Sequence, residues 1–241
     1  MRVAALSDVH GNIEALDAVL RDLERRDVNE IYCLGDSVGY GPNPNECLAL
    51  LSERSSVLLA GNHDQAAIGL LDIEYFNEEA RRALLWTREA LNERGRKILG
   101  TLQVEKAVPE KDLLLVHSTP KEPGAWHYLM TLWDAEVNFH YFDQRICILG
   151  HSHQAFVIEK LASGEMASYR SRATLGKSER YIINAGSVGQ PRDRDPRACY
   201  VILEDEKVEF VRVQYDIEKT QKKMREAGLP RFLIERLAKG I

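Results

Sequence analysis

Short apolar runs alternate with helical patterns in the first sixty residues. The apolar runs at 2–7, 31–34 and 56–60 predict three buried strands. Between the first two, after an expected N-cap at Asn12, apolar residues recur at helical spacing, at Ile13, Leu16, Val19, Leu20 and Leu23. A second helix is expected at about 45–52, after a loop rich in glycine and proline. Three strands separated by two helices predict a parallel βαβαβ beginning.

The remainder of the chain has a mixed middle and a strand-rich end. The middle is expected to form a long helix, two strands, a helix and a strand, at 77–93, 103–107, 112–116, 132–139 and 146–149. After a break at Gly95, the long helix is expected to continue towards Leu99. Five strand patterns joined by turns then predict an antiparallel half, at 155–161, 166–171, 180–184, 198–204 and 207–213. Helices from Asp216 and Pro230 are expected to follow, and we interpret 1–241 as one domain with two halves.

The composition is typical of a soluble globular protein, with 44% hydrophobic and 29% charged residues. Lys and Arg number 32 against 37 Asp and Glu, and a net charge of -5 argues against broad binding to nucleic acid. The four cysteines form no Cys-x-x-Cys pair, and the N-terminus turns polar at Ser7, too early for a signal peptide. No apolar run approaches the roughly 18 residues of a membrane span, so we expect a cytoplasmic protein.

Polar residues that can bind metal follow five of the expected strands. They are Asp8, His10, Asp36, Asn62, His63, His117, His151 and His153, and they include five of the seven histidines. Side chains two positions apart on an extended backbone point the same way, so we expect Asp8 to converge with His10 and His151 with His153. The carboxyl ends of parallel strands are where ligands collect, so the whole set is expected on one rim.

Mixed imidazole and carboxylate ligands suit transition metals such as Mn, Fe, Zn, Co or Ni. The set is too large for one ion, whereas two ions that share a bridging carboxylate would use all of it. Each residue alone is better explained as an ordinary turn residue or a solvated histidine. The five groups together favour a metal site with two divalent ions.

Five motifs resemble those of the calcineurin-like metallophosphoesterase superfamily. In order they are Asp8-Val9-His10, Gly35-Asp36, Gly61-Asn62-His63-Asp64, the strand-end His117 and Gly150-His151-Ser152-His153. The segment 184–189, followed by Pro191-Arg192, also resembles a loop of the small prokaryotic YfcE-like branch. This resemblance implies a metallo-dependent phosphatase fold of class α/β (α+β), a four-layer α/β/β/α sandwich of two mixed sheets flanked by helices.

The resemblance also implies a role for each motif residue. One metal would be held by Asp8, His10, Asp36 and His153. The other would be held by Asp36, Asn62, His117 and His151, with Asp36 bridging the two. His63 would face the phosphoryl group as the catalytic residue. The implied reaction is hydrolysis of a small phosphodiester or nucleotide-type substrate, by in-line attack of a metal-bridging hydroxide.

The chain departs from the protein phosphatases of this superfamily after Gly35-Asp36. Those enzymes continue closely with Asp-Arg-Gly, whereas Ser37-Val38-Gly39-Tyr40-Gly41 stands here. A Ser/Thr protein phosphatase is therefore not expected. Asp64 would either orient His63 or cap the helix that follows it.

Substrate contacts are expected from loop residues beside the motifs, namely Tyr40, His127 and Arg192. Trp126 and Tyr128 flank His127 and would either stack a base or simply pack the loop. The helix at 77–93 is expected as a cover beside the site. Two alternatives stay open: a nuclease of the same superfamily, against which the net charge of -5 counts, and a non-catalytic scaffold with this fold. A homo-oligomer is compatible with the sequence, and no membrane partner is expected.

Overall fold

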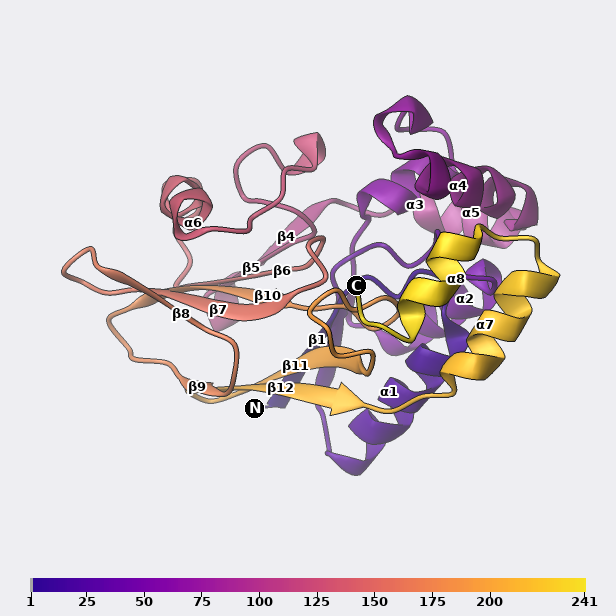
Figure 1. Ribbon diagram of the computed structural model, residues 1–241. Helices are drawn as coiled ribbons and strands as arrows, with labels where there is room; N and C mark the ends of the chain where they lie inside the picture. Colours follow the sequence, from indigo (N-terminus) through magenta and orange to yellow (C-terminus); the bar gives the residue numbers. More distant parts are fainter. Residues whose placement is uncertain (1) are drawn as a thin grey trace.

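The computed structural model describes residues 2–241 and contains two six-stranded sheets (Figure 1). The first sheet has the order β3-β2-β1-β11-β12-β9. Its strands are β1 (Arg2–Leu6), β2 (Glu30–Cys33), β3 (Val57–Leu58), β9 (Ala173–Thr174), β11 (Ala198–Glu204) and β12 (Lys207–Val213). The pairs β1–β2 and β2–β3 are parallel, which confirms the βαβαβ beginning, and the other pairs in this sheet are antiparallel.

The second sheet has the order β4-β5-β6-β10-β7-β8. Its strands are β4 (Glu105–Val108), β5 (Leu113–Val116), β6 (Ile146–Leu149), β7 (Ala155–Lys160), β8 (Met166–Tyr169) and β10 (Arg180–Ala185). Here β5–β6 and β6–β10 are parallel and the outer pairs are antiparallel. The strands after residue 154 pair mostly antiparallel, as expected, and the exception is β10, which pairs parallel with β6 and antiparallel with β7.

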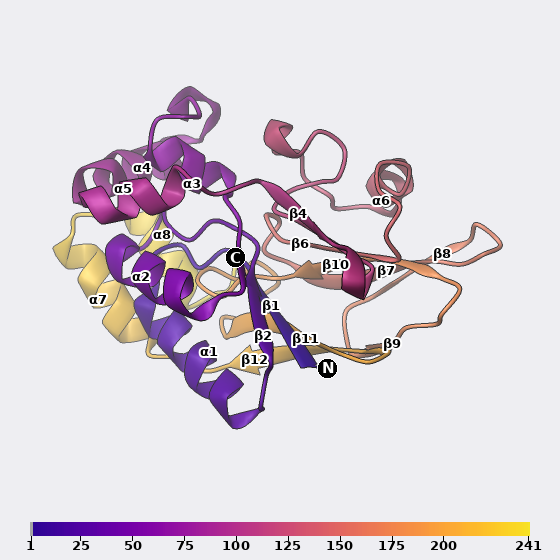
Figure 2. The ribbon, with the colours of Figure 1, turned by 180° about the vertical axis from the view of Figure 1, so that it is seen from behind.

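Helices cover the outer faces and one end of the two sheets. They are α1 (Ile13–Arg25), α2 (Pro44–Arg54), α3 (Asn62–Ala67), α4 (Glu78–Ala90), α5 (Glu93–Leu99), α6 (Leu132–Asn138), α7 (Ile217–Glu226) and α8 (Arg231–Leu237). In both views α6 stands apart beside the second sheet, whereas the other helices gather at the opposite end (Figure 1, Figure 2). Across residues 2–241, none of these helices combines the length and apolar character that a membrane crossing requires.

Side chains along each strand alternate between the core that separates the two sheets and the helices on the outer face. In β1, Val3 and Ala5 face the core between the sheets, whereas Ala4 and Leu6 pack with α1. Side chains of β6 alternate in the same way: Ile148 faces the inter-sheet core, whereas Cys147 and Leu149 pack with α6. Strands buried on both faces read as continuous apolar runs, which is the pattern seen in the sequence. The four-layer α/β/β/α sandwich is confirmed.

Several boundaries differ from the sequence-based expectations. The strand expected at 56–60 is only Val57–Leu58, and helix α3 starts at Asn62 itself. The helix expected at 77–93 ends at Ala90, ahead of Gly95. Asn92 causes this early break, because its side chain accepts a hydrogen bond from the Gly95 N–H and so caps a new helix, α5.

Candidate metal centre

The ligand-type residues follow the carboxyl ends of strands from both sheets, in loops except for Asn62 and His63, which begin helix α3. β1 leads to Asp8 and His10, β2 to Asp36, β3 to Asn62 and His63, β5 to His117, and β6 to His151 and His153. Backbone hydrogen bonds continue past the strand ends: the Asp8 N–H donates to Gly35 O at 3.0 Å and the His10 N–H to Asp36 O at 2.9 Å. The two sheets also meet here, since the His151 N–H donates to Asp8 Oδ2 at 3.0 Å.

The backbone is left-handed at five of these eight residues. The φ angles are 55° at Asp8, 51° at His10, 52° at Asp36, 63° at His151 and 57° at His153. The convergence of Asp8 with His10 was expected from an extended backbone, and that reason is wrong because β1 ends at Leu6. Left-handed backbone at non-glycine residues costs on the order of 1–3 kcal/mol each and concentrates at functional sites. The loops are held in this shape by the backbone hydrogen bonds around them.

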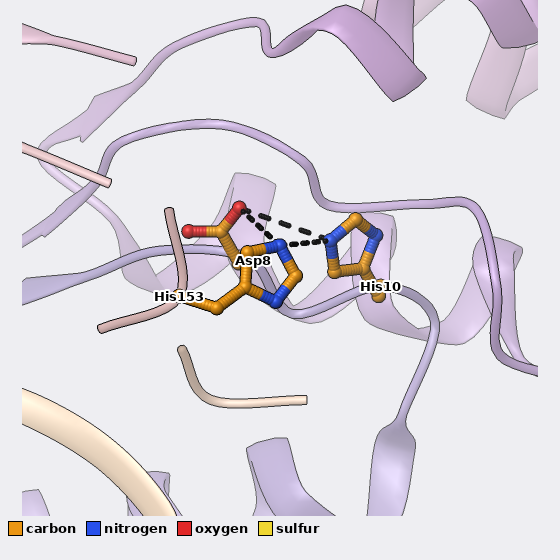
Figure 3. Close-up of side chains that lie close together, drawn as sticks. All are labelled: Asp8, His10 and His153. Atoms are coloured by element: carbon orange, nitrogen blue, oxygen red, sulfur yellow. Dashed lines mark hydrogen bonds and ion pairs between the residues drawn. The ribbon is translucent and has the colours of Figure 1, made fainter. Parts of the chain in front are cut away.

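Asp8, His10 and His153 form one group of ligand atoms (Figure 3). Asp8 Oδ1 is 3.2 Å from His153 Nε2 and 3.8 Å from His10 Nε2. The two imidazoles face each other, with their Nε2 atoms 3.2 Å apart. One carboxylate oxygen and two ring nitrogens therefore converge on one point.

Asp36 lies between this group and a second group that contains His117 and His151. Its Oδ2 is 3.6 Å from His10 Nε2 and 3.5 Å from His117 Nε2. Its Oδ1 accepts the backbone N–H of His63 at 2.9 Å, so the start of α3 orients the carboxylate. Asp36 thus touches both groups, as a bridging ligand must.

Hydrogen bonds to backbone carbonyls set the tautomers of the imidazoles. Three rings direct Nδ1 at a carbonyl oxygen, at 3.1, 3.0 and 2.6 Å, in the pairs His10 with Val38, His117 with Leu34 and His153 with Gln190. A carbonyl oxygen only accepts, so Nδ1 carries the hydrogen and Nε2 keeps a free lone pair. His151 is reversed: its Nε2 faces Trp126 O at 2.9 Å, which leaves the lone pair on Nδ1. Such partners of the second ring nitrogen are typical of metal-binding histidines.

Burial decides most protonation states in the cluster. It lowers the pKa of four imidazoles, those of His10, His63, His151 and His153. Burial acts the same way on His117, but the charge of Asp36 outweighs it and raises the pKa of His117 to about 9. Burial would raise the pKa values of the Asp8 and Asp36 carboxyls, yet the neighbouring histidines keep both low. The site therefore holds two carboxylates among mostly neutral imidazoles.

This donor set fits metal cations. Several buried ligand-type atoms have no hydrogen-bond partner within residues 2–241, among them Asp8 Oδ1, Asn62 Oδ1 and the Nε2 of His117. In the neutral tautomers set by the carbonyl groups, the facing Nε2 atoms of His10 and His153 both present lone pairs. Leaving buried polar atoms unpaired is costly. Bound cations would satisfy these atoms, and mixed imidazole, carboxylate and amide ligation suits a divalent transition metal.

Asp64 does not contact the His63 ring in the way that an orienting group would. Its carboxylate accepts the backbone N–H groups of Gly61, Ser37 and Val38, at 3.0, 3.2 and 3.0 Å. Asp64 therefore caps the helix to which it belongs and ties that helix to the loop after Asp36. Of the two roles considered for Asp64, the structure supports capping, within α3 rather than ahead of a later helix.

Gly61 allows the close approach of α3 to Asp36. A Cβ added at Gly61 would lie 2.1 Å from Asp36 Oδ1, so Gly61→Ala is expected to displace this carboxylate. We expect metal affinity to fall by about 10–100-fold, the usual effect of disturbing the support of a metal ligand. Calorimetric titration with Mn²⁺ measures the change. Gly100→Ala is the matched control, because its added Cβ would come no closer than 3.4 Å to another atom, and unchanged affinity in Gly61→Ala contradicts the expectation.

A cavity of about 510 Å³ opens beside the cluster. Asn62, His63 and His151 line it where it meets the ligand groups. Asn77, the N-cap of α4, and Ala80 in its first turn line one side. The expected cover beside the site is thus provided by the start of this helix and the segment before it.

The structure brings two of the three expected substrate contacts to this region. The Tyr40 ring lies 4.6 Å from the ring of His10 and 4.4 Å from that of His63, centroid to centroid, and lines the cavity. Arg192 donates to Tyr40 Oη at 3.4 Å and lies over the Tyr40 ring. His127 is exposed and lines a different hollow, so it is not brought to the cavity.

Some residues that shape the site left no usable signal in the sequence. The carbonyl groups of Val38, Leu34 and Gln190 orient imidazoles, but every residue carries a carbonyl and nothing marks these three. Trp126 and Tyr128 were noted beside His127, and both line the cavity. Phe76, whose ring packs edge-on against His63 at 4.9 Å, was not singled out.

Comparison with known proteins shows the family of the chain. The family model for the calcineurin-like phosphoesterase superfamily domain matches residues 1–207. An uncharacterized protein of Methanocaldococcus jannaschii is 39% identical over 242 residues, covering 99% of this chain and 98% of its own length. The crystal structure of a metallophosphoesterase from Sphaerobacter thermophilus has 42% identity and a TM-score of 0.88, and the match covers 100% of this chain and 99% of that one. The YfcE phosphoesterase of E. coli is a more distant structural neighbour, with 17% identity, a TM-score of 0.48 and coverage of 89% and 100%. The chain belongs to the calcineurin-like phosphoesterase superfamily, a metal-dependent family.

Proposed function

We propose that this protein is a dinuclear metal-dependent phosphoesterase that hydrolyses small phosphodiester or nucleotide-type substrates. The observation that carries the proposal is the position of Asp36, whose Oδ2 lies between His10 Nε2 and His117 Nε2. A carboxylate shared by two groups of ligand-type side chains suits two cations. The family match supports phosphoric ester hydrolysis as the reaction class.

The two groups divide the ligands in a way that supports the assignment made from the sequence. Asp8, His10, Asp36 and His153 would hold one ion, and Asp36, Asn62, His117 and His151 the other. When bound, two such ions lower the pKa of a shared water and neutralise the phosphoryl oxygens during an in-line displacement. The candidates for the ion are Mn, Fe, Zn, Co and Ni.

His63 is the proposed catalytic residue. Its imidazole lines the cavity and packs between the rings of Tyr40 and Phe76, at 4.4 and 4.9 Å. The Nδ1 side of the ring lies against Gly39, where an added Cβ would be only 2.5 Å away. Packing therefore aims the ring, which would donate its N–H to a phosphoryl oxygen or to the leaving oxygen as charge develops.

Arg192 is proposed to strengthen anion binding at the same place. Its guanidinium donates to Gln190 Oε1 at 2.9 Å and to Tyr40 Oη, and its backbone N–H donates to His153 O at 3.1 Å. No carboxylate forms an ion pair with this guanidinium in the part of the chain that the structure describes. A half-buried cation without an acidic partner next to the ligand groups favours an anionic substrate.

The setting proposed for the enzyme is the cytoplasm. All four cysteines are buried and free, at Cys33, Cys47, Cys147 and Cys199. Burial also raises the pKa of the thiols, for example that of Cys33 to about 12. Unpaired, unreactive thiols are typical of proteins from a reducing compartment.

Metal removal tests the proposal directly. Metal analysis of the purified protein is expected to find two divalent ions per chain. Hydrolysis of bis(p-nitrophenyl) phosphate should disappear after treatment with a chelator and return on addition of Mn²⁺, because both the nucleophile and the charge neutralisation depend on the ions. The same assay with p-nitrophenyl phosphate compares diester with monoester hydrolysis.

The outcomes separate the proposal from its rivals. Fewer than two ions together with no metal-restored activity contradicts the enzymatic function. Two ions without hydrolysis of any phosphoester indicates a non-catalytic scaffold instead. Hydrolysis of single-stranded oligonucleotides in preference to the small esters indicates a nuclease.

A further inference from the structure

The cavity beside the ligand groups has two unlike parts. Asn62, His63 and His151 make a polar floor at the metal cluster. Above it the lining is largely apolar and aromatic, and apart from Tyr40 it comes from two separate segments of the chain. Leu71, Tyr75 and Phe76 lie in the segment between α3 and α4, and Trp126 and Tyr128 lie in the loop after β5. With about 510 Å³, the cavity is in the size range of pockets that hold whole small molecules.

Tyr128 offers an open aromatic face. One face of its ring stacks on the imidazole of His151, with centroids 4.2 Å apart and planes inclined by 14°. The side chain is nevertheless 53% exposed. Tyr75 lines the same cavity from the other segment and is 84% exposed. Leaving large aromatic rings exposed beside an active site forgoes the free energy of burying them, which a ligand between them would recover.

Trp126 adds a specific polar group to this aromatic part. Its indole Nε1 is buried and has no hydrogen-bond partner in the described residues 2–241. An unpaired buried donor is costly, and buried indole N–H groups normally find an acceptor. The backbone of Trp126 is left-handed, with φ 58°, and its carbonyl faces His151 Nε2. The indole is thus tied to the ligand cluster, and its N–H has no acceptor within the described residues.

We infer that this part of the cavity is a subsite for a planar aromatic ring carried by the phosphoester, with a ring acceptor paired to the Trp126 N–H. The inference rests on the proposed function, which places the phosphoryl group at the polar floor. The aromatic ring would stack on the open face of Tyr128, and Trp126 would select rings that contain a hydrogen-bond acceptor. A nucleobase meets both requirements, and a simple aryl group meets only the first.

Equilibrium binding to the Mn²⁺-loaded protein tests this subsite without relying on turnover. Adenosine 5′-monophosphate, phenyl phosphate and ribose 5-phosphate share the phosphate monoester but differ in the ring. Calorimetry is expected to show that adenosine 5′-monophosphate binds on the order of 10-fold more tightly than ribose 5-phosphate, the usual gain from stacking a base on an aromatic side chain. Phenyl phosphate should bind with intermediate affinity, because its ring stacks but offers no hydrogen-bond acceptor.

Variants show which side chain provides the gain in affinity for adenosine 5′-monophosphate. Tyr128→Leu should abolish most of the preference over ribose 5-phosphate, whereas Tyr128→Phe should keep it. Trp126→Phe retains a ring but removes the N–H, so it should weaken binding of adenosine 5′-monophosphate more than that of phenyl phosphate. Trp133→Leu is the control, because Trp133 is 75% exposed on α6 and lies outside the cavity lining.

Failure of the subsite is distinguishable from failure of the proposed function. If the loaded protein hydrolyses small phosphoesters but binds ribose 5-phosphate as tightly as adenosine 5′-monophosphate, the subsite is refuted and the function stands. Retention of the full preference in Tyr128→Leu also refutes it. If no phosphoester is hydrolysed while the ring preference is present, the proposed function fails and the subsite stands.

Discussion

Asp36→Asn is expected to lower phosphoester hydrolysis by roughly 1,000-fold or more, the equivalent of several kcal/mol of transition-state stabilisation. The substitution keeps the shape of the side chain but removes its negative charge. Asp36 Oδ2 is 3.6 Å from His10 Nε2 and 3.5 Å from His117 Nε2, so one side chain serves both ligand groups. A neutral amide in this place cannot hold two cations together, and we expect the metal content to fall from two ions to one or none.

Metal analysis and steady-state kinetics on the same preparation test this expectation. Asp143→Asn is a suitable control, because Asp143 is an exposed carboxylate in the loop before β6. The control should keep both ions and full activity. An Asp36→Asn protein that retains two ions and near-normal turnover would show that Asp36 does not bridge.

His63→Ala is the second substitution with a large expected effect. We expect kcat to fall by about 10²–10⁴-fold, the usual contribution of a positioned proton donor, while both ions stay bound. The reason is that, under the proposed assignment, the other residues would coordinate both ions without His63. Its ring is held by Tyr40 and Phe76 and faces the cavity where the substrate would lie.

His63 could be a catalytic residue or a metal ligand, and the two roles predict different metal contents for the His63→Ala protein. Its ligand atom lies close enough to those of His10 and Asp36 for the three to hold an ion together. Loss of metal from His63→Ala would therefore assign it as a ligand. His63→Asn provides a second test, since it keeps a polar side chain and leaves less empty space between the two flanking rings.

Much of the fold could be predicted because its signals are local. The βαβαβ beginning follows from apolar runs and a helical repeat, and Asn12 caps α1 as expected, accepting the Ala15 N–H. The ligand cluster could be predicted because polar residues follow the carboxyl ends of strands, where parallel topology gathers them. Neither inference needed the distances between residues.

The parts that escaped prediction depend on backbone conformation and on long-range contacts. Left-handed φ angles, as at Asp8 and His10, are uncommon in non-glycine residues, so the sequence pattern predicts an extended backbone instead. The start of α3 at Asn62 is stabilised by hydrogen bonds from the loop after β2 to Asp64, which a local pattern does not contain. The cavity joins two segments that come together only through tertiary packing, and this is also why His127 could not be distinguished from Trp126 and Tyr128.

Because the ligand-type residues come from both sheets, the site can form only when both sheets have folded and packed together. His10 and His153, 143 positions apart, lie face to face, and Asp36 from the first sheet meets His117 from the second. During synthesis, or in a partly unfolded chain with only one sheet in place, each half carries an incomplete set of ligands. Under the proposed function, phosphoesterase activity would thus appear only when the two sheets pack together at the end of folding. An unfinished chain would be inert towards the phosphoesters of the cell, so no separate inhibitor would be needed to restrain it.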